Sequence, residues 1–184
     1  MKYTKLKRMI FLALCCDMGL FSKKLIAPAA NVITEALHVP GGIATAFSLM
    51  FLVVAAMLAP GFGTAAAMGA VQSVIAFSFG MVGSMGALAP IGYIAPGLCI
   101  DCVMWIAKRL KIPGELTLLI SNMLASACAC LTANLIVFHL EGLVLLLYLA
   151  LSMTSGACCG LLADTLVKRL AAYMGESKTK EAHA

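Results

Sequence analysis

Charged residues are what this sequence has least of. Of its 184 residues only 13 are Lys or Arg and 8 are Asp or Glu, while 62% are hydrophobic. A soluble globular domain is about 45–50% apolar and about 25% charged, so this chain has too few charges to cover a globule in water. The same composition excludes disorder, which needs low hydrophobicity and high charge. The sequence therefore predicts a small integral membrane protein with a single domain.

Catalytic motifs are also lacking. The chain contains no phosphate-binding loop, no Gly-x-Ser-x-Gly turn and no His-Glu-x-x-His helix, the patterns that would indicate nucleotide hydrolysis, an esterase-type nucleophile or a zinc protease. We therefore expect a protein that is not an enzyme, has no ATPase site of its own and needs no cofactor.

Long uncharged runs are abundant and predict the fold class, an all-α integral membrane protein with six transmembrane helices. A bilayer core about 30 Å thick needs about 20 apolar residues per helix, and Pro-Gly pairs separate the runs. The first run, 9–21, has no small-x-small cleavage site after it, so we interpret it as a short first helix and not as a signal peptide. The predicted spans are 9–21, 42–60, 62–80, 90–107, 116–138 and 143–167. They form one domain, 1–174, followed by a polar cytoplasmic tail, 175–184.

The distribution of cations predicts the orientation. Six spans place both termini on one side, and all 13 Lys and Arg except Lys23 and Lys24 fall on that side. Because cytoplasmic loops carry the excess of Lys and Arg, we expect cytoplasmic N- and C-termini in a multi-pass protein of a bacterial-type plasma (inner) membrane.

Three carboxylates fall inside predicted spans, where ionisable groups are costly and often functional. Asp164 precedes Lys168 by four residues, which predicts a local ion pair on one helix. Asp101 has no such partner, so a contact to another helix and a role in coupling both stay open. Asp17 has no evident local partner.

Polar residues gather in the outer half of the predicted bundle and are our candidates for a ligand-binding site. Each of these residues alone is also compatible with a polar contact between helices. A site is favoured because all of them are expected at a similar depth in the membrane. Asn31 and Glu35 share one face if their segment is helical. The candidates are Asn31, Glu35, His38, Gln72, Ser78, Tyr93, Asn134, His139, Glu141 and Tyr148.

Eight cysteines raise the question of a metal. Cys99 and Cys102 flank Asp101 at a spacing that soft or borderline cations accept, but Cys in an apolar helix also behaves as a small hydrophobe. No second ligand pair lies nearby in the sequence, so we predict no metal site. The predicted outer segments contain no Cys, which argues against a disulfide framework.

Pairs of small residues four apart let helices approach closely. We expect Gly69 with Ser73 and Gly156 with Gly160 to serve packing within the chain. On the first span, Ala13, Cys16 and Gly19 offer a face for another membrane subunit.

The layout of the whole chain resembles the substrate-binding S components of energy-coupling factor (ECF) transporters, and is most similar to their thiamine-related hydroxymethylpyrimidine group. The closest local similarity is the last span and its exit, Ser155 to Asp164 and Leu170 to Gly175, and a weaker one is Phe51 to Gly61. Family members commonly dock through Ala-x-x-x-Ala on the first helix. Here that spacing leads from Ala13 to Asp17, and Cys15 with Gly19 is the nearest substitute.

The resemblance implies a protein that captures a small water-soluble vitamin or precursor from outside. Its implied partners are a transmembrane coupling subunit and two ATPase subunits, within the lipid bilayer and without nucleic acid. Two alternatives from other classes stay open: a structural or assembly subunit of a membrane complex, and a metal-ion permease component that uses Cys99, Asp101 and Cys102.

Overall fold

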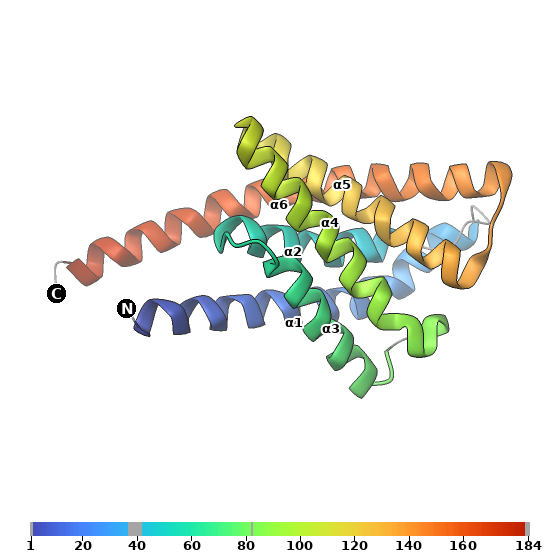
Figure 1. Cartoon of the computed structure of the whole chain (residues 1–184), viewed down its shortest axis with the longest axis horizontal. Coiled ribbons are helices and arrows are strands. Elements are labelled where there is room, and N and C mark those ends of the chain that lie inside the picture. Colours follow the sequence, from blue (N-terminus) through green and yellow to red (C-terminus); the bar gives the residue numbers. More distant parts are fainter. Residues whose placement is uncertain (1, 37–41, 82, 183–184) are drawn as a thin grey trace.

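A computed structural model describes residues 2–36, 42–81 and 83–182, with the side chains of 2–4, 31, 33–36, 83–84 and 173–182 excepted. Nearly all of this part of the chain is helical, and it contains no strand (Figure 1). The elements are α1 (Lys2–Ala36), α2 (Ile43–Leu58), α3 (Thr64–Ser78), the 3-10 helix η1 (Gly83–Leu88), α4 (Ala89–Leu110), α5 (Gly114–Ala133), the π-helix η2 (Asn134–Phe138) and α6 (Gly142–Ala182).

Among the described residues, three helices are long and apolar enough to cross a membrane. They are Met85–Leu110, Gly114–Phe138 and Gly142–Ala172. The helices expected at 42–60 and 62–80 are present as α2 and α3, but with 16 and 15 residues they span only about 24 and about 22 Å at a rise of 1.5 Å per residue. The all-helical fold class is therefore confirmed, together with helices of membrane-spanning length.

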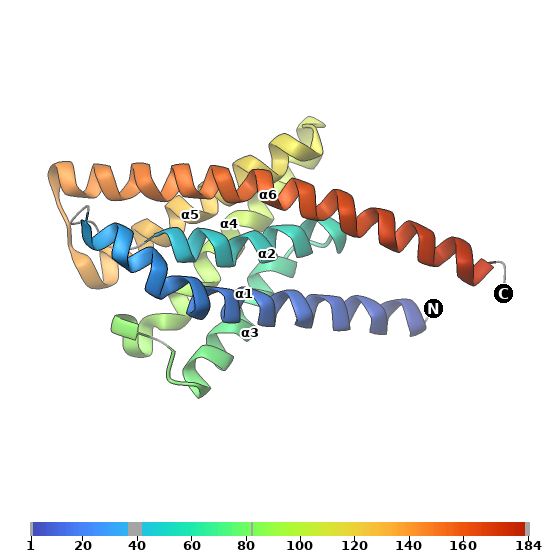
Figure 2. The ribbon, with the colours of Figure 1, turned by 180° about the vertical axis from the view of Figure 1, so that it is seen from behind.

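The first helix is not short, and this part of the prediction was wrong. α1 runs for 35 residues from Lys2 to Ala36 and contains Pro28, which gives it a length of about 52 Å. The sequence argument followed only the apolar run 9–21, but helix formation continues through Ser22, Lys23 and Lys24 into the segment expected outside. Figure 2 shows α1 changing direction in its second half.

The end of the chain is helical as well. α6 has 41 residues and continues to Ala182, so the polar segment that begins at Gly175 extends the last helix as far as the structure describes it. Both α1 and α6 project from the same end of the bundle (Figures 1 and 2).

The core is built around α2, which contacts each of the other five α-helices. Leu52 and Val53 are fully buried and Val54 is almost so. These side chains pack with residues such as Met68 of α3, Ile100 of α4 and Leu118 of α5 in one continuous hydrophobic cluster. A helix with apolar residues on all sides is expected at such a central position.

Glycines allow the closest helix contacts. A Cβ added at Gly69 would lie 2.4 Å from the carbonyl oxygen of Tyr93, and one at Gly160 would lie 2.7 Å from the Cα of Leu119. Since a real Cβ does not fit at such distances, these positions require Gly for the packing of α3 on α4 and of α6 on α5. The prediction that Gly69, Gly156 and Gly160 serve internal packing is confirmed.

Candidate functional site

Four of the candidate ligand residues lie around the turn between α5 and α6. Asn134 shapes that turn: its Oδ1 accepts the N–H of Leu140 at 2.8 Å, and its Nδ2 donates to the Leu140 carbonyl at 3.3 Å. His139, in the left-handed region with φ 50°, and Glu141 are exposed on the turn. Tyr148 is buried just inside it, with its ring edge-on to Phe138 at 6.0 Å.

A buried polar track continues from this turn toward the middle of the bundle. On α5 and its π-helical end, Asn122, Ser126, Cys130 and Asn134 recur every four residues, and all four are buried. Tyr148 and Ser152 recur at the same spacing on α6 and are buried as well. Because residues four apart share one helix face, the two helices present polar groups to each other over about three turns.

The inner part of the track holds polar atoms without partners. Asn122 Nδ2 donates to the carbonyls of Gly156 at 2.8 Å and Ala46 at 3.3 Å, which joins α5 to α6 and α2. Asn122 Oδ1 and the hydroxyls of Ser121 and Ser126 have no hydrogen-bond partner, although these residues are at most 1% exposed. A buried polar group left unpaired costs about 1–3 kcal/mol, so three neighbouring ones on α5 point to a functional role.

Sequence reasoning missed Ser121, Asn122, Ser126 and Ser152. It gathered polar residues by their depth in the outer half of the predicted spans, and it did not consider these four positions. The signal that would have found them is the four-residue spacing from Asn122 to Asn134.

Gln72 lies elsewhere in the bundle, where α3 meets α1 and α2. Its Nε2 donates to the carbonyl of Cys16 at 3.1 Å, and the side chain is 2% exposed. A Cβ added at Gly19 would lie only 2.7 Å from Nε2 and 3.2 Å from the carbonyl oxygen of Ser48. Gln72 therefore joins α3 to α1, close to the point where Gly19 approaches Ser48 of α2.

Tyr93 has a cationic neighbour. The ammonium of Lys23 on α1 lies over the Tyr93 ring on α4, 4.9 Å from its centroid, within the range of a cation–π contact. Both residues are half-buried. The sequence predicts Lys23 at the outer membrane surface, as one of the two cations on that side. In the structure it is instead half-buried over the Tyr93 ring.

Of the remaining candidates, Ser78 alone has a described side chain. Ser78 is exposed, and its hydroxyl donates to the Val74 carbonyl of its own helix. Asn31 and Glu35 lie in the last turns of α1, with side chains outside the described set, and His38 lies outside the described residues. Gln72, the Lys23–Tyr93 pair and the α5–α6 track are thus three separate polar groups.

The face proposed for a partner subunit on α1 is mostly occupied by the chain itself. Cys16 is 2% exposed and its thiol faces the Met68 carbonyl at 3.7 Å. Gly19 is buried against α2 and α3. Of the three residues only Ala13 is exposed, because one side of the helix from Cys15 to Leu20 packs into the bundle.

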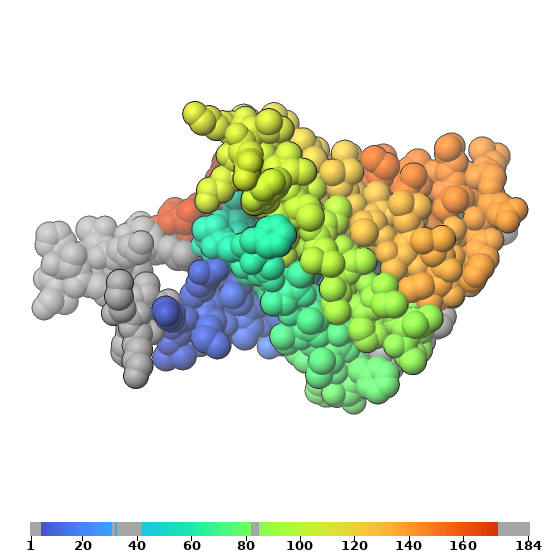
Figure 3. Space-filling view, viewed as in Figure 1, coloured from blue at the N-terminus to red at the C-terminus, as the bar shows by residue number. Residues whose placement is uncertain are grey.

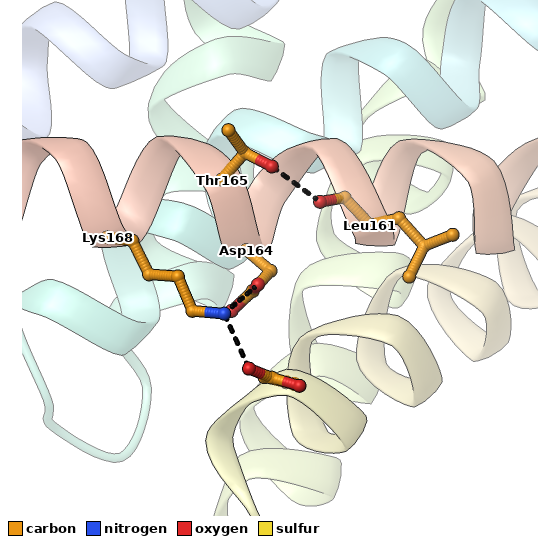
Figure 4. Close-up of polar contacts among 5 residues, drawn as sticks. Leu161, Asp164, Thr165 and Lys168 are labelled. Carbon is orange, nitrogen blue, oxygen red and sulfur yellow. Dashed lines mark hydrogen bonds and ion pairs between the residues drawn. The ribbon is translucent and has the colours of Figure 1, made fainter.

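The three carboxylates that fall inside predicted spans have different surroundings. Asp164 binds Lys168 at 2.7 Å, as its spacing predicted, and Lys168 also pairs with Glu115 of α5 (Figure 4). Asp101 is 3% exposed, and its two oxygens accept the N–H groups of Ala65 at 3.1 Å and Ala66 at 2.9 Å. Asp17 is exposed on α1 beside Met18, which is 54% exposed.

Within the described residues no group of three or more His, Cys, Asp and Glu side chains is arranged to hold a metal ion. All eight cysteines are free thiols. Asp101, the carboxylate between Cys99 and Cys102, is directed to the start of α3 instead. The residues of the metal-permease hypothesis therefore do not form a ligand set.

No protein-family model, curated protein or solved structure matches this chain. The layout of the sequence and the polar groups described above are therefore what points to a function.

Proposed function

We propose that this protein is the substrate-binding S component of an ECF-type transporter. In this proposal all six helices cross the inner membrane with both termini in the cytoplasm. The protein captures a small water-soluble vitamin or precursor from outside, in the thiamine-related class that the sequence resembles. A transmembrane coupling subunit and two ATPase subunits then deliver the ligand to the cytoplasm.

The observation that carries the proposal is the buried polar track between α5 and α6. It begins at the α5–α6 turn, opposite the projecting termini, and ends at Asn122 and Ser121 (Figure 1). Sites for small ligands combine mostly apolar walls with a few placed donors and acceptors. The unpartnered oxygens of Ser121, Asn122 and Ser126 supply such groups, and the Tyr148 ring supplies an apolar surface nearby.

The chemistry of the outer half also suggests what such a ligand carries. A cationic heterocycle would pair with Glu35 or Glu141, and its ring would stack on Tyr148 or Tyr93. Lys23 adds the opposite charge beside Tyr93, so a carboxylate or phosphate on the ligand would find a partner there.

A second candidate function is an assembly subunit of a membrane complex, and Asp17 favours it. This carboxylate is exposed on α1 next to Ala13, Leu14 and Met18, which are also exposed. A charge that faces lipid is costly, and a partner helix with a hydrogen-bond donor would shelter it. In the transporter proposal the same face meets the coupling subunit.

Purification from the native membrane separates the two functions. We expect a tagged chain, extracted in mild detergent, to bring down one larger membrane protein and ATPases with phosphate-binding loops. Asp17→Leu should reduce this recovery, while Asp164→Asn, which changes a carboxylate already paired with Lys168, should not. Recovery of a membrane complex without any ATPase would contradict the transporter proposal and support the assembly role.

A further inference from the structure

A cavity of about 540 Å³ lies between two turns of the bundle. One wall is the turn from α2 to α3, with Pro60, Gly61 and Phe62, and the other is the end of α4, with Trp105, Lys108 and Lys111. Both turns lie toward the end of the molecule from which the termini project (Figure 1). Figure 3 shows the end of α4 next to the α2–α3 turn on this face of the surface.

Cations surround this cavity. Lys108 and Lys111 line it, and both are exposed. Arg109 lies over the Trp105 ring at 4.4 Å, which holds its guanidinium next to the cavity wall. On the other side, Arg8 donates to the carbonyls of Ala59 at 2.9 Å and Pro60 at 3.2 Å.

The nearby carboxylates do not neutralise these cations by direct pairing. Asp101 lines the cavity, but each of its oxygens accepts a backbone N–H at the start of α3. Glu115, at the start of α5, pairs with Lys168. The cavity therefore has a surplus of positive charge at Lys108 and Lys111.

Apart from Asp101 and Thr117, the rest of the wall is apolar. Met57 and Met104 line the cavity, and Phe62 and Trp105 stand at it with 73% and 48% of their surface exposed. Trp is enriched where a membrane meets water, and Lys and Arg near a helix end reach toward the headgroups. A ligand that fits both the lysines and the apolar wall of this cavity has an anionic head and an apolar body.

We infer that this cavity binds an anionic phospholipid of the cytoplasmic leaflet. Lys108 and Lys111 contact the headgroup phosphate, and the upper part of the acyl chains lies against Phe62 and Trp105. Basic pockets between helices on the cytoplasmic side are suited to anionic headgroups, and each cation near the surface contributes to the attraction. A free phosphate ester would meet the lysines without the apolar contacts. The inference requires only that the protein lies in a membrane with this end inward, and it is independent of the transport proposal.

The test is native mass spectrometry of the full-length protein in detergent with added lipid. The probes are phosphatidylglycerol, zwitterionic phosphatidylcholine with the same chains, and water-soluble glycerol phosphate. The variant is Lys108→Gln with Lys111→Gln. The matched control is Lys5→Gln with Arg169→Gln, which removes two exposed cations that do not line the cavity.

We expect phosphatidylglycerol to bind the wild-type protein well above phosphatidylcholine and glycerol phosphate not to bind. The Lys108 and Lys111 double variant should lose about 30-fold in affinity for phosphatidylglycerol, while the control changes little. Equal loss in the control would mean that net charge alone attracts the lipid, and unchanged binding in the double variant would mean that the cavity is not the site. Glycerol phosphate binding as tight as the lipid would assign the cavity to a free phosphate ester. Each of these three results would overturn the inference.

Discussion

The carboxylate of Asp101 on α4 accepts the backbone N–H of Ala66, in the first turn of α3, at 2.9 Å. The first N–H groups of a helix have no partner within it, and its N-terminus favours negative charge. This contact explains how a carboxylate is buried at 3% exposure in an apolar bundle. It also lies beside a close approach of the two helices, where a Cβ on Gly97 would meet the Ala65 carbonyl oxygen at 2.6 Å.

Replacing Asp101 should therefore destabilise the fold. Asp101→Leu leaves the buried N–H of Ala65 and the half-buried N–H of Ala66 without their acceptor, and we expect it to lower the free energy of unfolding by about 2 kcal/mol. Asp101→Asn keeps one acceptor and should cost about 1 kcal/mol. Unfolding by sodium dodecyl sulfate in mixed micelles, followed by circular dichroism, measures both. Asp17→Asn is the control, since Asp17 is exposed, and equal losses at the two positions would contradict the capping role.

The contact of α5 with α6 should not tolerate a side chain at Gly156. A Cβ there would lie 2.8 Å from Ser126 Oγ and 3.0 Å from the Asn122 carbonyl oxygen, so we expect Gly156→Val to cost about 1–3 kcal/mol through overpacking. Ala150→Val, at an exposed position of the same helix, should be nearly neutral in the same unfolding assay. If both variants unfold at the same denaturant concentration, the close contact does not limit the packing.

The proposed orientation predicts which positions are accessible from outside the cell. A membrane-impermeant maleimide added to intact cells should label Glu141→Cys, in the turn opposite the projecting termini. Lys180→Cys should react only after the membrane is opened, because the cation distribution places the C-terminus inside. Labelling of the wild-type chain gives the background from its eight cysteines. Labelling of position 180 but not 141 in intact cells would reverse the topology.

The Lys23–Tyr93 pair predicts a contribution of charge to ligand capture. If an anionic group of the ligand pairs with this ammonium, Lys23→Met should lower affinity about tenfold or more, since hydrogen bonds to charged groups contribute about 1.5–3 kcal/mol. The neighbouring Lys24 is exposed, so Lys24→Met serves as the control. The fraction of purified molecules that carry a small-molecule adduct is the readout. Similar adduct fractions in the two variants would remove Lys23 from the site.

The helices were largely predictable because each contains an apolar run with few charges, bounded by Pro, Gly or cations. The ends of α1 and α6 were not, because hydrophobicity marks the part of a helix that suits lipid and not where the helix stops. Lys23 and Lys24 interrupt the apolar run, yet both have long unbranched side chains that favour helix. The polar tail after Gly175 continues α6 in the same way.

The polar contacts were harder to foresee. The i,i+4 pair of Asp164 and Lys168 follows from spacing alone and is confirmed, whereas the addition of Glu115 depends on how α5 packs on α6. The separations of Asp101 from Ala66 and of Lys23 from Tyr93 are 35 and 70 positions along the chain, and no local pattern encodes such contacts. The candidate ligand residues were predicted to lie together because they share a depth in the membrane. Depth does not determine which helix faces meet, and those of the candidates whose side chains are described lie in separate groups.

The central claim, that the protein captures a small solute, is tested most directly by native mass spectrometry of the protein released from its own membrane without added ligand. The account predicts a defined adduct of roughly vitamin mass. It also predicts that the adduct is weakened in Glu35→Gln or His139→Ala and in Asn122→Leu, while Ala150→Val keeps it. A chain that carries no adduct in any preparation, and that gains none when incubated with a mixture of water-soluble vitamins, would contradict the claim.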